Sequence, residues 1–208
     1  MLPEFILYLK PANPMTYPEF REMKIKELND INPDELEGID RKYYDYRKIN
    51  LQRSTRLEKH FNSSEELISI INNNQDTQYW MLITESWCGD SAQVLPIIAK
   101  AAEFNTNISL KIILRDKNPQ IMDLYLTNGK SKSIPVFVGF DSDGKELFRW
   151  GPRPESAKKL VAELKAKKME NSEVNKQLHL WYGRNRGKEF EQELIALLKN
   201  SMIETKAR

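Results

Sequence analysis

Between Gln78 and Trp150 the chain alternates between short apolar runs and stretches with apolar residues at helical spacing. Runs such as Gln78–Glu85 and Ile108–Leu114 are typical of buried strands. Strands joined through a helix are expected to pair in parallel, whereas the strands around the turn Asp141–Gly144 must be antiparallel. This order predicts an α/β fold in which helices flank a central mixed sheet. The predicted elements are a strand over 78–85, a helix over 90–104, a strand over 108–114, a helix over 118–127, strands over 134–140 and 145–150, and a helix over 157–164.

The residues before and after this region are predicted to be helical. Thr16 and Glu19 have the spacing of a capping box, and a long helix is expected from about Asp40 to Phe61. A second capping box is expected at Ser63–Glu66. These patterns divide the chain into a loose extension over 1–14, a helical extension over 15–75, an α/β domain over 76–168, and C-terminal helices over 169–208 that pack on the core.

The composition excludes several kinds of site. One cysteine among 208 residues rules out a disulfide within the chain and any metal or iron–sulfur site built from several cysteines of one chain. The two histidines, His60 and His179, are far apart in the sequence, so we expect no metal site and no cofactor. A formal net charge of +2 gives no sign of nucleic-acid binding.

The expected location follows from the same kind of argument. The apolar run Phe5–Leu9 has no basic segment before it and no small-residue cleavage site after it, which disfavours a signal peptide. No segment approaches the ~20 apolar residues that a membrane-spanning helix needs. We therefore expect a cytoplasmic protein without membrane contact, whose thiol stays reduced.

The single cysteine stands where a predicted strand meets a predicted helix, in the segment Trp87-Cys88-Gly89-Asp90-Ser91. Free backbone N–H groups and the helix dipole at such a position lower the pKa of a thiol. Asp90 and Glu85 oppose this effect, because a nearby carboxylate disfavours a second negative charge. We therefore expect a thiol less acidic than that of an optimised redox site. The alternative is a small buried residue without a chemical role.

Several motifs, in this order, resemble those of the thioredoxin superfamily over roughly Gln78 to Lys168. They are the W-C-G of Trp87–Gly89, Pro96 in the following helix, the D-K-N-P of Asp116–Pro119, the family's cis-proline segment at Ser133-Ile134-Pro135, and Gly151 after the last strand. The wider chain, with W-C-G-D-x-A-Q, Y-L-T-N-G and W-G-P-R-P, is similar to a bacterial branch with a single cysteine in W-C-G-D-S. The resemblance implies a thioredoxin-like fold with helical N- and C-terminal extensions.

Two positions depart from the family pattern. The family motif has a second cysteine where this chain has Ser91, and the family's buried carboxylate corresponds here to Leu82. A dithiol enzyme releases its product with the second thiolate, and an alcohol cannot perform that step at neutral pH. The resemblance therefore does not extend to ordinary dithiol disulfide reduction.

The resemblance also implies a substrate groove beside Cys88. A cis bond before Pro135 would expose the backbone of Ser133 and Ile134 to an extended chain, and Trp87 would supply an apolar platform. The simpler interpretation of Pro135 is the first residue of a strand.

These observations favour thiol–disulfide exchange by one thiol. Cys88 would form a mixed disulfide with a protein or a low-molecular-weight thiol, and an external thiol would resolve it. Two alternatives stay open: a redox-inactive module for peptide binding or assembly, and glutathione-dependent iron–sulfur cluster binding between two chains. Trp87 and the lack of a glutathione-binding pattern count against the cluster. Enzymatic activity is thus an open question, and the added helices could form a homodimer interface.

The segment Arg41–Lys59 combines seven basic residues with three tyrosines, a combination that could bind phosphate or nucleic acid. Asp40, Asp45 and Glu58 dilute its charge, and a charged face on a long helix is typically solvated. We expect the tyrosines to dock this helix on the core.

Overall fold

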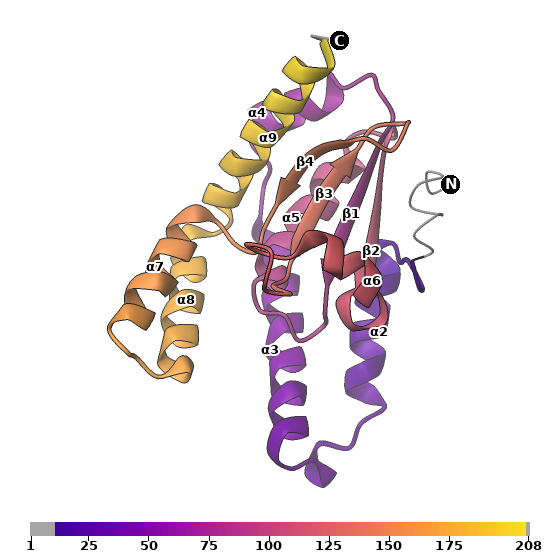
Figure 1. Cartoon of the computed structure of the whole chain (residues 1–208). Coiled ribbons are helices and arrows are strands. Elements are labelled where there is room, and N and C mark those ends of the chain that lie inside the picture. The colour runs from indigo at the N-terminus through magenta and orange to yellow at the C-terminus, as the bar shows by residue number, and fades with distance from the viewer. Residues whose placement is uncertain (1–10, 207–208) are drawn as a thin grey trace.

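The computed structural model describes residues 11–206, and side chains from residue 11 to residue 203. Its centre is a four-stranded sheet with the strand order β2-β1-β3-β4 (Figure 1). The strands are β1 (Gln78–Thr84), β2 (Ile108–Leu114), β3 (Val136–Phe140) and β4 (Glu146–Trp150).

The pairing of the strands follows from their connections. β1 pairs in parallel with β2, because α5 (Ser91–Glu103) carries the chain back between them. β3 is antiparallel to both β1 and β4. In the turn between β3 and β4, Asp141 Oδ1 accepts hydrogen bonds from the backbone N–H groups of Asp143 and Lys145. The predicted α/β fold with a mixed sheet is therefore confirmed.

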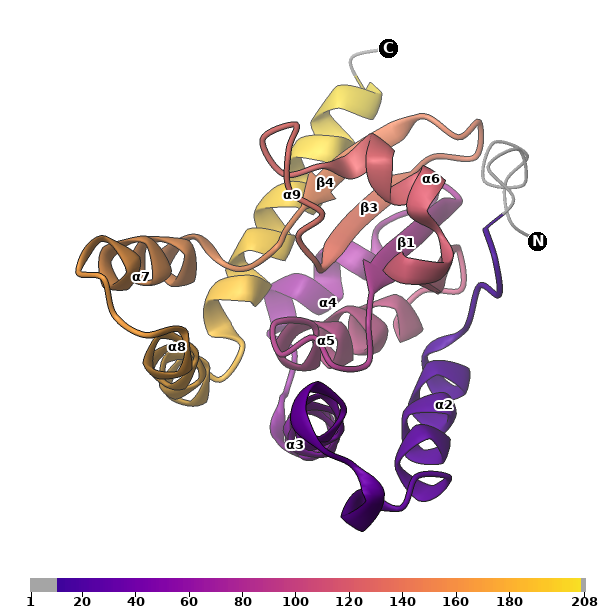
Figure 2. The ribbon, with the colours of Figure 1, turned by 60° about the horizontal axis from the view of Figure 1, so that its bottom comes forward.

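Alternate residues of β1 point to opposite faces of the sheet and pack in two separate apolar clusters. Trp80 and Leu82 belong to the larger cluster, with α5, α4 (Glu65–Asn72) and α9 (Lys188–Lys206). Met81 and Ile83 belong to the smaller cluster, with α6 (Pro119–Met122) and η3 (Asp123–Tyr125). Figure 2 shows α4 and α5 on one side of the sheet and α6 on the other.

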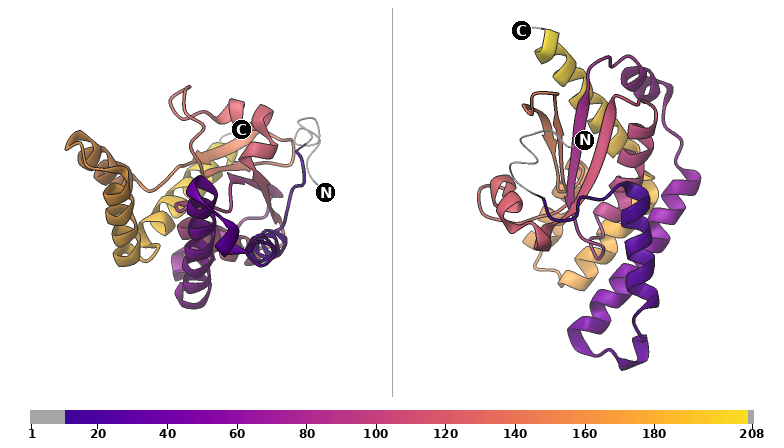
Figure 3. Two further views of the ribbon diagram at one scale, coloured as in Figure 1. Left: turned by 90° about the horizontal axis from the view of Figure 1, so that it is seen from below. Right: turned by 90° about the vertical axis from the view of Figure 1, so that its right-hand side faces the viewer.

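The N-terminal helices extend the first of these layers. α2 (Tyr17–Asn29) has the predicted capping box of Thr16 and Glu19, and η1 (Pro33–Glu35) leads into α3 (Gly38–His60). α2 and α3 lie side by side, as both views in Figure 3 show, and α3 packs along α5. The long charged helix is therefore part of the layer that covers α5.

After β4 the chain forms a helical hairpin of α7 (Glu155–Ala166) and α8 (Asn171–Asn185), which lies to one side of the sheet (Figure 1). The two helices share a small apolar cluster that includes Val161, Leu178 and Tyr182. α9 then returns along β4 and α4. In the described part of the chain, no helix is both long and apolar enough to cross a membrane.

The structure corrects three local predictions. The helix expected over 118–127 consists of α6 and the 3-10 turn η3, and the strand expected over 134–140 begins only at Val136 after the cis bond to Pro135. Ser64, not Ser63, caps α4 by accepting a hydrogen bond from the N–H of Leu67, without a capping box. Residues 1–10 of the expected loose extension over 1–14 lie outside the described residues.

Candidate functional site

Cys88 lies between the end of β1 and the start of α5, beneath the loop that leads into β3. Its side chain is 6% exposed, and its thiol donates a hydrogen bond of 3.5 Å to the carbonyl oxygen of Ile134. The peptide bond between Ile134 and Pro135 is cis. The residues predicted as the reactive thiol and as the substrate-binding segment are thus in direct contact.

The surroundings of Cys88 disfavour its thiolate. Burial, and to a lesser extent the carboxylate of Asp90, raise the pKa of the thiol to about 11. The side chain of Ser91 and the backbone N–H groups of Asp90 and Ser91 oppose this shift. The helix N-terminus therefore acts as predicted, but desolvation outweighs it.

Ser91 faces the end of β1, behind Cys88. Its hydroxyl accepts a hydrogen bond from Thr84, and both side chains are buried. A cavity of about 10 Å³ lies here, lined in part by Lys24, Glu85, Cys88 and Ser91, and its volume suits one water molecule. Burial lowers the pKa of the Lys24 ammonium, which donates to Ser54, to about 8. Leu82 is fully buried in the apolar core, so the titratable groups behind the thiol are Lys24 and Glu85.

Asp90 connects the cysteine motif to the C-terminal hairpin. One carboxylate oxygen accepts a hydrogen bond of 2.7 Å from Arg153 Nη2, and the other accepts one of 2.7 Å from the hydroxyl of Tyr182 on α8. Burial raises the pKa of Asp90, although Arg153, Tyr182 and Arg53 favour its charged form. The sequence predicts only an electrostatic effect on the thiol, whereas the structure shows that Asp90 also connects α8 to the cysteine motif.

Gly89 provides space rather than an unusual backbone angle. It is not among the glycines with positive φ, but a Cβ atom placed on it would lie 2.7 Å from Cε1 and Nε2 of His179. The absence of a side chain at this position therefore allows α8 to approach the cysteine motif.

Trp87 lies on the other side of the cysteine, partly exposed. Its ring makes an edge contact with Tyr43 of α3, with 5.5 Å between ring centroids. The guanidinium of Arg115 lies over the ring at 4.9 Å, a cation–π geometry. The predicted apolar platform is thus covered in part by two polar partners.

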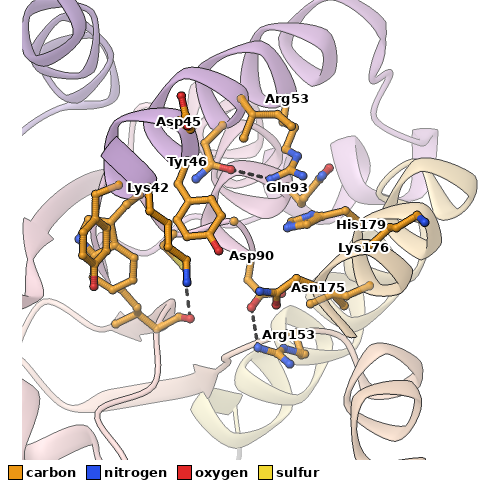
Figure 4. A pocket seen from close by; sticks show the side chains of 18 of the residues that line it. Lys42, Asp45, Tyr46, Arg53, Asp90, Gln93, Arg153, Asn175, Lys176 and His179 are labelled. Atoms are coloured by element: carbon orange, nitrogen blue, oxygen red, sulfur yellow. Dashed lines mark hydrogen bonds and ion pairs between the residues drawn. The ribbon is translucent and has the colours of Figure 1, made fainter. Parts of the chain in front are cut away.

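Most of the cysteine motif and the loop before Pro135 line a groove of about 1090 Å³ between α3 and α8. Figure 4 shows its side chains coming from α3, the cysteine motif, the loop after β4, and α8. All the predicted site residues except Ser91 and Pro135 line it, namely Trp87, Cys88, Gly89, Asp90, Ser133 and Ile134. Ser91 lies behind the groove, and Pro135 follows Ile134 at its edge.

Sequence reasoning missed the walls of this groove. The sequence predicts a solvated charged face on α3, but cations of this face line the groove, and it predicts no position near the thiol for Arg153, His179 or Tyr182. The one available signal was the W-G-P-R-P motif, which holds Arg153 directly after the last strand. In the part of the chain that the structure describes, no group of three or more histidine, cysteine or acidic side chains could hold a metal ion.

Comparisons with known proteins agree with this architecture. A family model described as Thioredoxin matches residues 39–167. A crystal structure of a protein of unknown function from Pseudomonas aeruginosa is similar, with 15% identity, a TM-score of 0.55, and coverage of 90% of this chain and 99% of the other. An HIV epitope scaffold is similar too, with 16% identity, a TM-score of 0.52, and coverage of 89% and 98%. The comparison with curated proteins gave no match.

Proposed function

The chain belongs to the thioredoxin family, and from this premise we propose that it is a single-thiol member in which Cys88 exchanges with disulfides and an external thiol resolves the product. The Cys88 thiolate attacks a disulfide of a protein or a low-molecular-weight thiol, forms a mixed disulfide and releases the other half as a thiolate. A second, external thiolate then attacks the mixed disulfide, takes over the bound half and restores Cys88. The reducing equivalents come from that external thiol, which a reducing cytoplasm would supply.

The contact between the thiol and the Ile134 carbonyl carries this proposal. It places the sulfur at the bottom of a groove, next to the backbone of the segment before Pro135. An extended ligand chain in the groove would pass this backbone and bring its own sulfur to Cys88. Ser91 bonds to Thr84 and offers no second thiol, which supports resolution by an external one.

Alkylation of Cys88 is expected to be slow at neutral pH and to accelerate strongly with rising pH. Since the thiolate is the reacting form and burial raises the pKa to about 11, the rate rises by about tenfold per pH unit up to that value. The measurement is the rate of iodoacetamide modification between pH 6.5 and 10.5 by intact-mass spectrometry, with far-UV circular dichroism to show that the fold persists. N-acetylcysteine serves as the control. If the rate of the native protein levels off at or below the pH at which the rate of N-acetylcysteine levels off, the pKa of Cys88 is not raised.

The exchange itself is tested with oxidised glutathione. We expect the native protein to gain one glutathionyl group at Cys88 and to lose it when reduced glutathione is added in excess. The urea-unfolded protein is the matched control for an accessible thiol, and Cys88→Ser shows any modification outside the cysteine. The proposal fails if the unfolded chain forms the adduct while the native chain forms none over several hours.

A second candidate is a redox-inactive module that binds a ligand in the same groove. Burial of Cys88 and its raised pKa favour this function, because a module without redox chemistry needs no thiolate. In that case Cys88→Ser leaves ligand binding unchanged and no native adduct forms. The experiment with oxidised glutathione therefore separates the candidates, because slow alkylation is expected of both.

A further inference from the structure

The groove above Cys88 is strongly cationic, and we infer that it binds a small polyanion, a molecule with two or more phosphate or carboxylate groups. Its basic residues come from α3, the turn η2 (Arg115–Lys117), the loop before Pro135, the loop after β4, and α8. This site goes beyond the proposed exchange reaction, because anion binding does not require Cys88 to react. The basic residues that line it are Lys42, Arg53, Arg56, Arg115, Lys132, Arg153 and Lys176.

The acidic residues of the groove do not balance these charges. Asp45 and Asp90 are the acidic side chains that line it. Asp90 is engaged with Arg153 and Tyr182, and Asp45 forms an ion pair with Arg41 outside the groove. Four of the seven basic residues pair with carboxylates, namely Arg115, Lys132, Arg153 and Lys176. Lys42, Arg53 and Arg56 form no ion pair among the described residues, so the lining keeps an excess of positive charge that concentrates anions near the thiol.

Arg53 and Arg56 are the centre of this excess. They are three residues apart on α3 and therefore project from neighbouring positions of the helix. Neither forms an ion pair with any residue between 11 and 203, and the hydrogen bond of Arg53 goes to the neutral amide of Asn50. Burial, followed by the charge of Arg56, lowers the pKa of Arg53 to about 10. Two adjacent guanidinium groups without a carboxylate partner form a suitable contact for a phosphate or carboxylate.

His179, on the opposite wall, lies close enough to Arg53 and Arg153 for their charges to affect it. Burial, followed by Arg53 and Arg153, lowers the pKa of His179 on α8 to about 3, so its ring is neutral. Figure 4 shows Arg53, His179 and Arg153 around Asp90, although they come from three different parts of the chain. Nε of Arg153 and Nδ1 of His179 are buried without hydrogen-bond partners. These two nitrogen atoms therefore have hydrogen-bonding capacity that no described side chain uses.

The size of the groove favours a small molecule. Its volume of about 1090 Å³ is just above the range of typical small-molecule sites, which measure roughly 300–1,000 Å³. Trp87, Tyr43 and Tyr46 add aromatic surface beside the cations. A molecule that combines several anionic groups with an organic body would use both features.

Isothermal titration calorimetry with pyrophosphate and, separately, with citrate tests the inference at low ionic strength, where screening is weak. We expect binding of at least one of the two probes with one site per chain and a dissociation constant that rises with added salt. Arg53→Gln combined with Arg56→Gln is expected to weaken it by about tenfold or more. Arg56→Gln alone, at an exposed position without hydrogen bonds, keeps the test valid if the double variant does not fold.

The matched control removes the same charge elsewhere. Lys159→Gln combined with Lys165→Gln, on the exposed part of α7, should leave the affinity within about twofold. A preference for pyrophosphate identifies phosphate as the anionic group, and a preference for citrate identifies carboxylates. The inference is overturned if neither probe binds, or if the groove variants and the control weaken binding equally. Binding that persists in Cys88→Ser separates this site from the exchange reaction.

Discussion

Replacement of Asp90 by alanine is expected to lower the free energy of unfolding by about 3 kcal/mol, because it leaves Arg153 partly buried without its counterion. The hydroxyl of Tyr182 loses its acceptor as well. For a chain of this length the melting temperature should fall by about 6–12 °C. Thermal and urea unfolding of the two proteins at pH 7 measure the effect.

Two further variants show whether the loss comes from the docking of α8. Tyr182→Phe removes one hydrogen bond to a charged group and should cost about 1.5 kcal/mol. Asp143→Ala, in an exposed turn where the carboxylate makes no hydrogen bond, is the control and should change stability by less than about 0.5 kcal/mol. Hydrogen exchange should accelerate first in α8 of the Asp90 variant. An Asp90 variant as stable as the control would show that the carboxylate does not hold the hairpin.

Replacement of Trp80 by alanine is expected to cost still more, about 4 kcal/mol of unfolding free energy. Trp80 is 1% exposed, and its ring makes edge contacts with Phe137 on the neighbouring strand β3 and with Phe148 on β4. Its indole nitrogen also donates a hydrogen bond of 3.0 Å to Gln78. The substitution therefore opens a cavity between the sheet and α5 and leaves a buried amide oxygen without a donor.

The midpoint of urea unfolding measures this effect, with the slope of the transition as a check on two-state behaviour. Leu124→Ala, at a position that is 55% exposed, is the control and should cost less than about 1 kcal/mol. If the Trp80 variant unfolds at nearly the same urea concentration as the control, this side chain does not hold the sheet against α5.

The order of the central strands and helices could be predicted because apolar periodicity is a local property. β1 and β2 are short and mostly apolar, and α5 has apolar residues at helical spacing. The residues of each element therefore predict whether it is a strand or a helix. The position of Cys88 at a strand–helix junction follows from the same pattern. The bounds of α6 were less predictable, because a four-residue helix and a 3-10 turn have no stable period.

The walls of the groove could not be predicted, because they depend on how distant helices pack. Arg53 on α3 and His179 on α8 meet near Gly89, although 126 residues separate them in the sequence. Periodicity shows that α3 has a charged face but not that part of this face turns toward another helix. The pKa of Cys88 was unpredictable for a related reason, since it depends mainly on burial.

The link from Asp90 to α8 has a consequence for the chain during its synthesis. Asp90 binds Arg153 and Tyr182, which leave the ribosome 63 and 92 residues later. β3, with the carbonyl of Ile134 before it, also emerges well after Cys88. The nascent chain therefore lacks these contacts around the cysteine motif until Ile134, Arg153 and Tyr182 have been translated. Cys88 is thus more accessible in the nascent chain than in the folded protein, where it is 6% exposed in the groove.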